Sequence, residues 1–124
     1  MSSILLIDDE QQVLEVLGEM LRLEGHEVEC AGNGMEAMEL SEQRDFDLVI
    51  TDLIMPEKEG LETIVDLRKS SEDIPILAMS GGGRIGPRDY LETAKFVGAN
   101  ATLMKPFARA ELIATIDELL SPAA

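Results

Sequence analysis

The chain has 124 residues, 45% of them hydrophobic and 3% aromatic, and its 25 acidic residues against ten basic ones give a formal net charge of −15. That length suits one domain with one core, and the negative charge disfavours binding to nucleic-acid backbones or anionic lipid. The single cysteine, Cys30, cannot form an internal disulfide, and no apolar run approaches the roughly 20 residues of a membrane span, so we expect a cytoplasmic protein that does not insert into membranes.

Short apolar runs alternate with amphipathic stretches along the chain, and the runs predict buried strands. Apolar residues at helical spacing follow each run and predict helices, with Gly25 ending the first and Asn33-Gly34 starting the second. We expect strands at 4–7, 28–31, 47–51, 75–79 and 101–104, and helices around 13–21, 34–40, 61–67, 88–97 and 112–120. The alternation predicts an α/β fold in which helices cover both faces of a parallel sheet.

Functional side chains follow four of the five predicted strands. Asp8-Asp9-Glu10 follows the first strand, Asp52 the third, Ser80 the fourth and Lys105 the fifth. Because ligands of open parallel sheets bind beyond the carboxyl ends of the strands, we expect these side chains to meet at one edge of the sheet.

Each of these residues also has an ordinary structural interpretation. Asp8 or Asp9 could be the N-cap of the first helix, Ser80 could start a turn, and Lys105-Pro106 could be a plain loop. Their joint position at the ends of the correct strands favours a functional site.

The chemistry of these residue types explains why they would be grouped. Three close carboxylates repel one another, and a divalent cation such as Mg²⁺, which prefers oxygen ligands and keeps open positions, removes that conflict. Asp8, Asp9 and Asp52 could supply the ligands, and Asp52 would then remain ionised as a nucleophile toward phosphorus. Lys105 could pair with phosphoryl oxygens, and the Ser80 hydroxyl could donate a hydrogen bond to another.

These residues in this order resemble the receiver domain of two-component response regulators of the chemotaxis type. The resemblance covers essentially the whole chain and depends on Ile7-Asp8-Asp9-Glu10, Asp52-Leu53-Ile54-Met55-Pro56 with Gly60 beyond, Ser80, and Lys105-Pro106-Phe107. It implies a flavodoxin-like, doubly wound (βα)5 three-layer sandwich with strand order 2-1-3-4-5. Residues 1–124 would form a single receiver domain.

The resemblance implies a signalling switch rather than an enzyme. Asp52 would accept a phosphoryl group from a phosphohistidine on a histidine kinase or a phosphotransfer protein. A downstream protein target would read the resulting change in conformation. The resemblance assigns Mg²⁺ to Asp9, Asp52 and the backbone carbonyl of Ile54, with Asp8 acting through a metal-bound water.

It also assigns roles around the phosphate. Lys105 would pair with the phosphoryl group, and Pro106 would follow a cis peptide bond that places this lysine. The Ser80 hydroxyl would move toward the phosphate and report its arrival. Many receivers carry an aromatic switch residue three positions before the lysine, whereas this chain has Thr102, so the aromatic half of the switch does not carry over. The glycine-rich segment 80–87 is either an ordinary surface loop or one that orders when Ser80 engages phosphate.

Three alternatives remain open from the sequence. The chain could be a receiver fragment of a larger regulator or hybrid kinase, although its start at Met1 and its short tail favour a stand-alone domain. It could be a metal-dependent phosphatase that forms an aspartyl phosphate, but such enzymes usually carry a second Asp where this chain has Ile54. It could be a binding module that is never phosphorylated, which the complete set of site residues argues against.

Overall fold

The computed structural model describes residues 2–53, 59–71, 73–80, 94–95, 98–105 and 107–121. Four sequence predictions lie outside these residues: Ile54 as a carbonyl ligand, Pro106 after a cis bond, the glycine-rich loop beyond Ser80, and most of the helix at 88–97. Of that helix only Ala94 and Lys95 are described, and both are helical.

Five parallel strands form a single sheet in the order β2-β1-β3-β4-β5, which confirms the expected doubly wound topology. The central strands are buried along almost their whole length, which explains why their sequences are continuous apolar runs. The strands are β1 (Ser3–Ile7), β2 (Glu27–Ala31), β3 (Leu48–Asp52), β4 (Ile76–Ser80) and β5 (Ala101–Met104).

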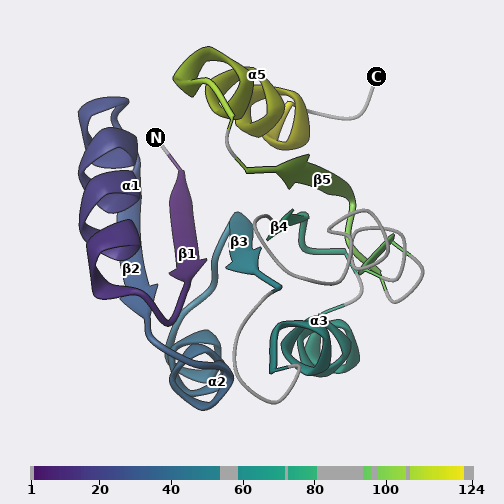
Figure 1. Cartoon of the computed structure of the whole chain (residues 1–124). Coiled ribbons are helices and arrows are strands. Elements are labelled where there is room, and N and C mark those ends of the chain that lie inside the picture. Colours follow the sequence, from purple (N-terminus) through teal and green to yellow (C-terminus); the bar gives the residue numbers. More distant parts are fainter. Residues whose placement is uncertain are drawn as a thin grey trace.

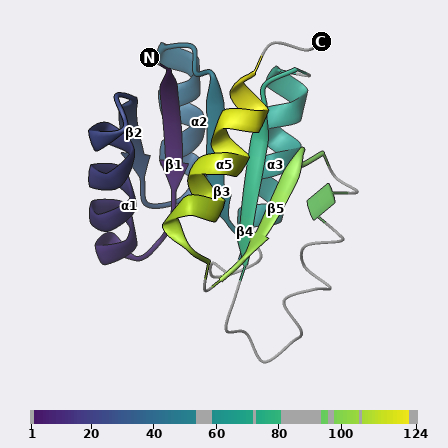
Figure 2. The same cartoon turned by 90° about the horizontal axis from the view of Figure 1, so that it is seen from above.

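Helices cover both faces of this sheet. The described helices are α1 (Gln11–Leu23), α2 (Gly34–Gln43), α3 (Glu59–Ser70) and α5 (Arg109–Leu120). Figure 1 shows α1 and α5 on one face and α2 and α3 on the other, and Figure 2 shows the helices lying along the strands. No helix in the part of the chain that the structure describes is long and apolar enough to cross a membrane.

The two faces of the sheet have separate hydrophobic cores, because successive side chains of a strand point to opposite sides. In β1, Leu5 and Ile7 pack into the core under α2 and α3, whereas Ile4 and Leu6 pack into the core under α1 and α5. All four side chains are fully buried. Both cores therefore hold β1 rigidly just before the acidic residues that follow it.

Two predicted helix ends are confirmed, the end of α1 at Gly25 and the start of α2 at Asn33. Gly25 follows α1 with φ +94, a backbone conformation that favours glycine, and its N–H donates to the Arg22 carbonyl at 3.0 Å. Asn33 is the N-cap of α2, and its side chain accepts a hydrogen bond from the Glu36 N–H at 2.9 Å.

Strands β3 and β4 extend one residue beyond the predicted ends. Asp52 is therefore the last residue of β3 and pairs in register with Met79, and Ser80 is the last residue of β4 and pairs with Met104. The strands continue because each still has a paired neighbour at that position. The sheet itself thus fixes the direction of both functional side chains.

Candidate functional site

Three carboxylates meet at the carboxyl ends of β1 and β3, which are neighbours in the sheet. Asp8, Asp9 and Asp52 each place one carboxylate oxygen within 4.8 Å of the others. Asp8 and Asp52 are buried, whereas Asp9 is exposed. The in-register pairing of Ile7 with Thr51 brings the ends of the two strands together.

Neither Asp8 nor Asp9 is the N-cap of α1, so that structural interpretation is wrong. The N-cap is Glu10, which makes no side-chain capping bond. The Asp8 carboxylate instead accepts a hydrogen bond from the Glu10 N–H at 2.9 Å, which orients it beside the other carboxylates.

Lys105 brings a positive charge to the same place from the end of β5. Its ammonium nitrogen lies 3.5 Å from an oxygen of Asp8 and 3.5 Å from an oxygen of Asp52. The Lys105 N–H also donates to the Ser80 carbonyl at 2.7 Å, which ties the end of β5 to the end of β4. Both carboxylates are almost fully buried, so this ion pair is less screened by water than a surface pair.

Burial raises the pKa of Asp8 above its ordinary value of 3.8, and the negative charge of Asp9 raises it further. The hydrogen bond from Glu10 and the charge of Lys105 lower this pKa but do not cancel the effect of burial. Three carboxylates beside one lysine also leave the site with an excess of negative charge. A divalent cation would complete the balance, and a set of hard oxygen ligands fits Mg²⁺.

Ser80 reaches this edge of the sheet as a fully buried residue. Its hydroxyl has no hydrogen-bond partner among the residues that the structure describes. A buried hydroxyl without a partner costs about 1–3 kcal/mol. The position of Ser80 between the strands that carry Asp52 and Lys105 would let an arriving anion supply that partner.

Thr102 is half-buried on β5 and pairs in register with Ala78 of β4. Its side chain is too small to swing between buried and exposed positions as an aromatic ring can. The structure thus gives no large side chain at this position for a readout of the site.

An apolar groove beside the site was not predicted from the sequence. It has a volume of about 430 Å³ and lies between α1 and the segment that follows Lys105. Its apolar wall comprises Val13, Val16, Leu17 and Phe107. The available signal was an apolar stripe on α1 too wide for one buried face, and Val16 is indeed 65% exposed.

The sequence profile of the family described as the response regulator receiver domain matches residues 4–117. The Transcriptional regulatory protein CpxR homolog of Haemophilus influenzae is 39% identical over 121 residues, which cover 97% of this chain and 51% of that protein. The Transcriptional regulatory protein PdtaR of Mycobacterium tuberculosis is 38% identical over 119 residues, which cover 95% of this chain and 56% of that protein. The chain spans about half the length of the curated relatives it matches.

Solved structures of similar size share the fold. The chemotaxis protein CheY4 of Vibrio cholerae superposes with a TM-score of 0.85 at 30% identity, over 97% of this chain and 99% of that chain. A CheY-like receiver domain protein of Methanospirillum hungatei gives a TM-score of 0.87 at 28% identity, over 97% of this chain and 94% of that chain.

Proposed function

We propose that Asp52 is the phosphorylated residue of this chain, which belongs to the response regulator receiver domain family. The chain is a phosphorylation-dependent switch of two-component signalling, a phosphoacceptor rather than a catalytic enzyme. The observation that supports Asp52 is its position. It is a buried carboxylate at the end of a central strand, grouped with Asp8 and Asp9 and 3.5 Å from the Lys105 ammonium.

The proposed step transfers a phosphoryl group from a phosphohistidine. A carboxylate oxygen of Asp52 attacks phosphorus, and the new O–P bond forms as the P–N bond to imidazole breaks. The imidazole nitrogen keeps the electron pair of the broken bond. Lys105 neutralises charge on the transferring oxygens. The Ser80 hydroxyl donates a hydrogen bond to one of them once the group is in place.

Asp9 and Asp52 are the proposed direct ligands of Mg²⁺, with Asp8 acting through a water. The backbone carbonyl of Ile54 completes the proposed set, although it lies outside the described residues. Bound Mg²⁺ would offset the mutual repulsion of the carboxylates and the charge of the incoming phosphate. The grouping of three carboxylates around one lysine supports this assignment, since it leaves the site with an excess of negative charge.

The partners implied by the family are a histidine kinase and a protein that reads the switch. We propose that the phosphodonor, a histidine kinase or a phosphotransfer protein, contacts the apolar groove of Val13, Val16, Leu17 and Phe107. Lys105 lines the same groove, so a protein seated there would be adjacent to the phosphoacceptor. A net charge of −15 argues against direct contact of this domain with nucleic acid.

We also propose that residues 1–124 form one receiver domain, because the family match extends over residues 4–117. A cytoplasmic location also belongs to the proposal. It is supported by the lone cysteine, which suits a reducing compartment.

Intact-mass analysis after incubation with Mg²⁺ and acetyl phosphate tests the assignment of Asp52. The unmodified sequence should gain one phosphoryl group, and Asp52→Asn should gain none. Asp117→Asn is the matched control, because it removes the same charge from an exposed position on α5 and should be phosphorylated normally. An equal adduct on Asp52→Asn would move the site elsewhere, and no adduct on any protein would remove the proposal.

A further inference from the structure

A cleft lies at the amino ends of β3 and β4, at the opposite edge of the sheet from Asp52. We call it the amino-edge cleft. Its volume is about 430 Å³, within the range of about 300–1,000 Å³ that is usual for small-molecule sites. The residues that define it here are Ser41, Asp45, Phe46, Leu67, Ser71 and Ile74.

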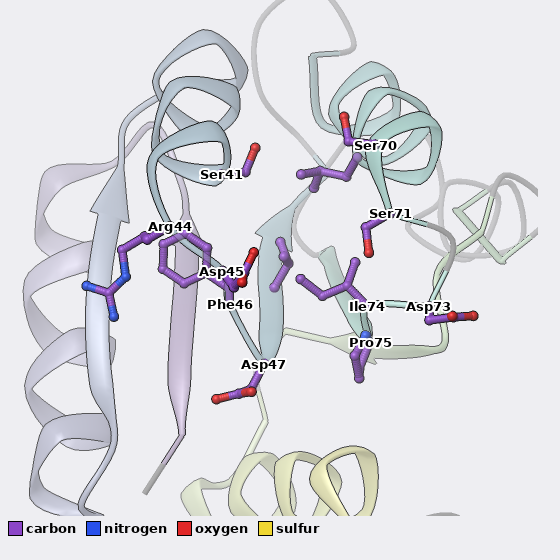
Figure 3. Close-up of a pocket in the computed structure, with 12 residues that line it drawn as sticks. Ser41, Arg44, Asp45, Phe46, Asp47, Ser70, Ser71, Asp73, Ile74 and Pro75 are labelled. Atoms are coloured by element: carbon purple, nitrogen blue, oxygen red, sulfur yellow. The ribbon is translucent and has the colours of Figure 1, made fainter.

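The floor of the amino-edge cleft is apolar and rigid. Phe46 and Leu67 are buried members of the core under α2 and α3, and the half-buried Ile74 packs against that core. Figure 3 shows the Ile74 side chain extending into the space between α2 and α3. A ligand body resting here would cover apolar surface that now faces water.

The polar wall of the cleft offers acceptors for a positive charge. No hydrogen bond or ion pair of the Asp45 carboxylate is found among the described residues, and Figure 3 shows this side chain on the same side of the cleft as Ser41. The Ser41 hydroxyl already donates a hydrogen bond to the Met38 carbonyl at 2.9 Å. The lone pairs of the Ser41 oxygen therefore remain to accept a hydrogen bond from a ligand.

The other charged groups around the cleft are already engaged. Arg44, the one basic residue among the described residues that line the cleft, pairs with Glu27 and Glu29 of β2 and points away from the cleft in Figure 3. The Asp47 carboxylate accepts the Ser3 N–H at 2.8 Å. Asp73 also lines the cleft, but its side chain is exposed and points away from the cleft in Figure 3. Asp45 is therefore the carboxylate best placed to bind a ligand.

The end of helix α2 adds to the negative potential. Both α2 and α3 end at this edge. No basic residue lies in the last turn of α2, whereas Arg68 and Lys69 lie in the last turn of α3 and offset the partial charge of that helix end. The carboxyl end of a helix carries a partial negative charge that favours cations. Anionic ligands are thus disfavoured. One available carboxylate over an apolar floor also suits a bare metal ion poorly, because such ions require several oxygen ligands.

We propose that the amino-edge cleft binds a small organic cation, a primary amine carried on an apolar body. The ammonium group would contact Asp45 and Ser41, and the apolar body would lie against Phe46, Leu67 and Ile74. This site is separate from the phosphoacceptor and does not depend on phosphorylation of Asp52.

NMR titration of the ¹⁵N-labelled protein with 2-phenylethylamine tests the proposal, with 2-phenylethanol as the uncharged ligand of matched shape. Saturating Mg²⁺ keeps the amine from the acidic site at Asp52, and an ionic strength of about 0.15 M screens the general charge of the chain. The amine should shift the amide signals of Phe46, Ser71 and Ile74 in a saturable way. The alcohol should bind much more weakly.

Two matched variants separate a specific contact from general attraction. Asp45→Asn should weaken amine binding about fivefold, since one partly exposed ion pair is lost. Asp117→Asn, which removes the same charge from α5, should leave the affinity unchanged. Equal binding of amine and alcohol, or an equal effect of the two variants, would overturn the proposal. So would tighter binding of an N-acetylated arginine amide than of the amine, which would assign the cleft to a basic side chain of a partner protein.

Discussion

The ammonium nitrogen of Lys105 lies 3.5 Å from a carboxylate oxygen of Asp52, across the intervening strand β4. The two residues come from different strand ends, and the backbone bond from Lys105 to the Ser80 carbonyl fixes one of those ends. A cation held in this way is already in place before any phosphate arrives. Such preorganised charge stabilises a transition state without further rearrangement.

Replacement of Lys105 by alanine should slow phosphorylation of Asp52 by about a hundredfold, because the transferring oxygens lose their cation. Mg²⁺ binding should persist or tighten, since a competing positive charge has been removed. Initial rates of phosphoprotein formation from acetyl phosphate and calorimetric titration with Mg²⁺ measure the two effects. Lys105→Arg, which keeps the charge, should retain more activity than alanine, and equal rates for the two variants would contradict this role.

Replacement of Asp8 by asparagine should stabilise the protein at neutral pH when divalent ions are removed with EDTA. Burial raises the pKa of Asp8 in the folded state above its ordinary value of 3.8, which applies in the unfolded state. At pH values between these two pKa values, the folded state binds more protons than the unfolded state. Stability is therefore highest below that window, falls as pH rises through it, and stays reduced at pH 7. Asparagine removes this penalty.

Thermal unfolding as a function of pH measures the effect of Asp8. In EDTA the melting temperature of Asp8→Asn should exceed that of the unmodified sequence at pH 7, and the gap should narrow at acidic pH. Added Mg²⁺ should stabilise the unmodified sequence more than the variant, because a bound ligand stabilises the state that binds it. A lower melting temperature for the variant in EDTA would show that the pair with Lys105 outweighs burial.

Replacement of Ser80 by alanine should leave the free energy of unfolding unchanged or raise it by about 1 kcal/mol, because it removes a buried hydroxyl without a partner. Phosphorylation at Asp52 should continue. The amide shifts that beryllofluoride induces in β5 and α5 should shrink, because the hydroxyl that reports the phosphate is gone. Thr102→Ala is the control on the neighbouring strand, and a Ser80 variant with a full set of induced shifts would refute this readout.

Arg68 joins α3 to the segments before β4 and β5. Its guanidinium donates to the carbonyls of Gly98 at 3.0 Å and Ile74 at 2.6 Å, and to the side chain of Asn100 at 2.5 Å. Gly98 has φ +130, and a Cβ there would lie 2.8 Å from Cγ of Arg68. Burial lowers the pKa of Arg68, but the group remains charged at neutral pH.

Removal of this Arg68 contact should destabilise the fold strongly. Arg68→Met should lower the free energy of unfolding by about 2–4 kcal/mol, since the part-buried carbonyls of Gly98 and Ile74 lose their donor. Gly98→Ala should cost at least about 1 kcal/mol, from both its backbone conformation and its closeness to Arg68. Urea unfolding measures both. Lys69→Met, at the exposed neighbouring position, should change the free energy of unfolding little. An equal loss of stability in Lys69→Met would show that the positive charge, rather than the hydrogen bonds of Arg68, stabilises the fold.

The apolar groove next to Lys105 is the proposed contact surface of the phosphodonor. Val16→Lys should leave folding and phosphorylation by acetyl phosphate unchanged, because Val16 is 65% exposed. It should slow phosphotransfer from the cognate histidine kinase, because a charge replaces part of the apolar contact. Leu23→Lys is the matched control, on the same helix and 73% exposed but outside the groove. Equal kinetics for the two variants would place the contact elsewhere.

Much of the site could be predicted because its residues follow apolar runs directly. Strand burial produces continuous apolar sequence, and parallel strands end at one edge, so Asp8, Asp52, Ser80 and Lys105 could be grouped without coordinates. The ends of β3 and β4 lie one residue beyond the apolar runs that predict these strands. Asp52 and Ser80 belong to their strands, because pairing with a neighbour, which the local sequence does not report, decides where a strand stops.

The sequence by itself determined the alternation of strands and helices, and with it the edge where the acidic residues and the lysine meet. Only the tertiary structure decided what covers each surface. In the sequence Arg68 resembles any basic residue in the last turn of a helix, whereas in the structure it donates to Gly98 and Asn100. Val16 resembles a core residue in the sequence, whereas the structure leaves it 65% exposed. The physical reason is that periodicity reports which side of an element is apolar, whereas the partner of that side comes from a distant part of the chain.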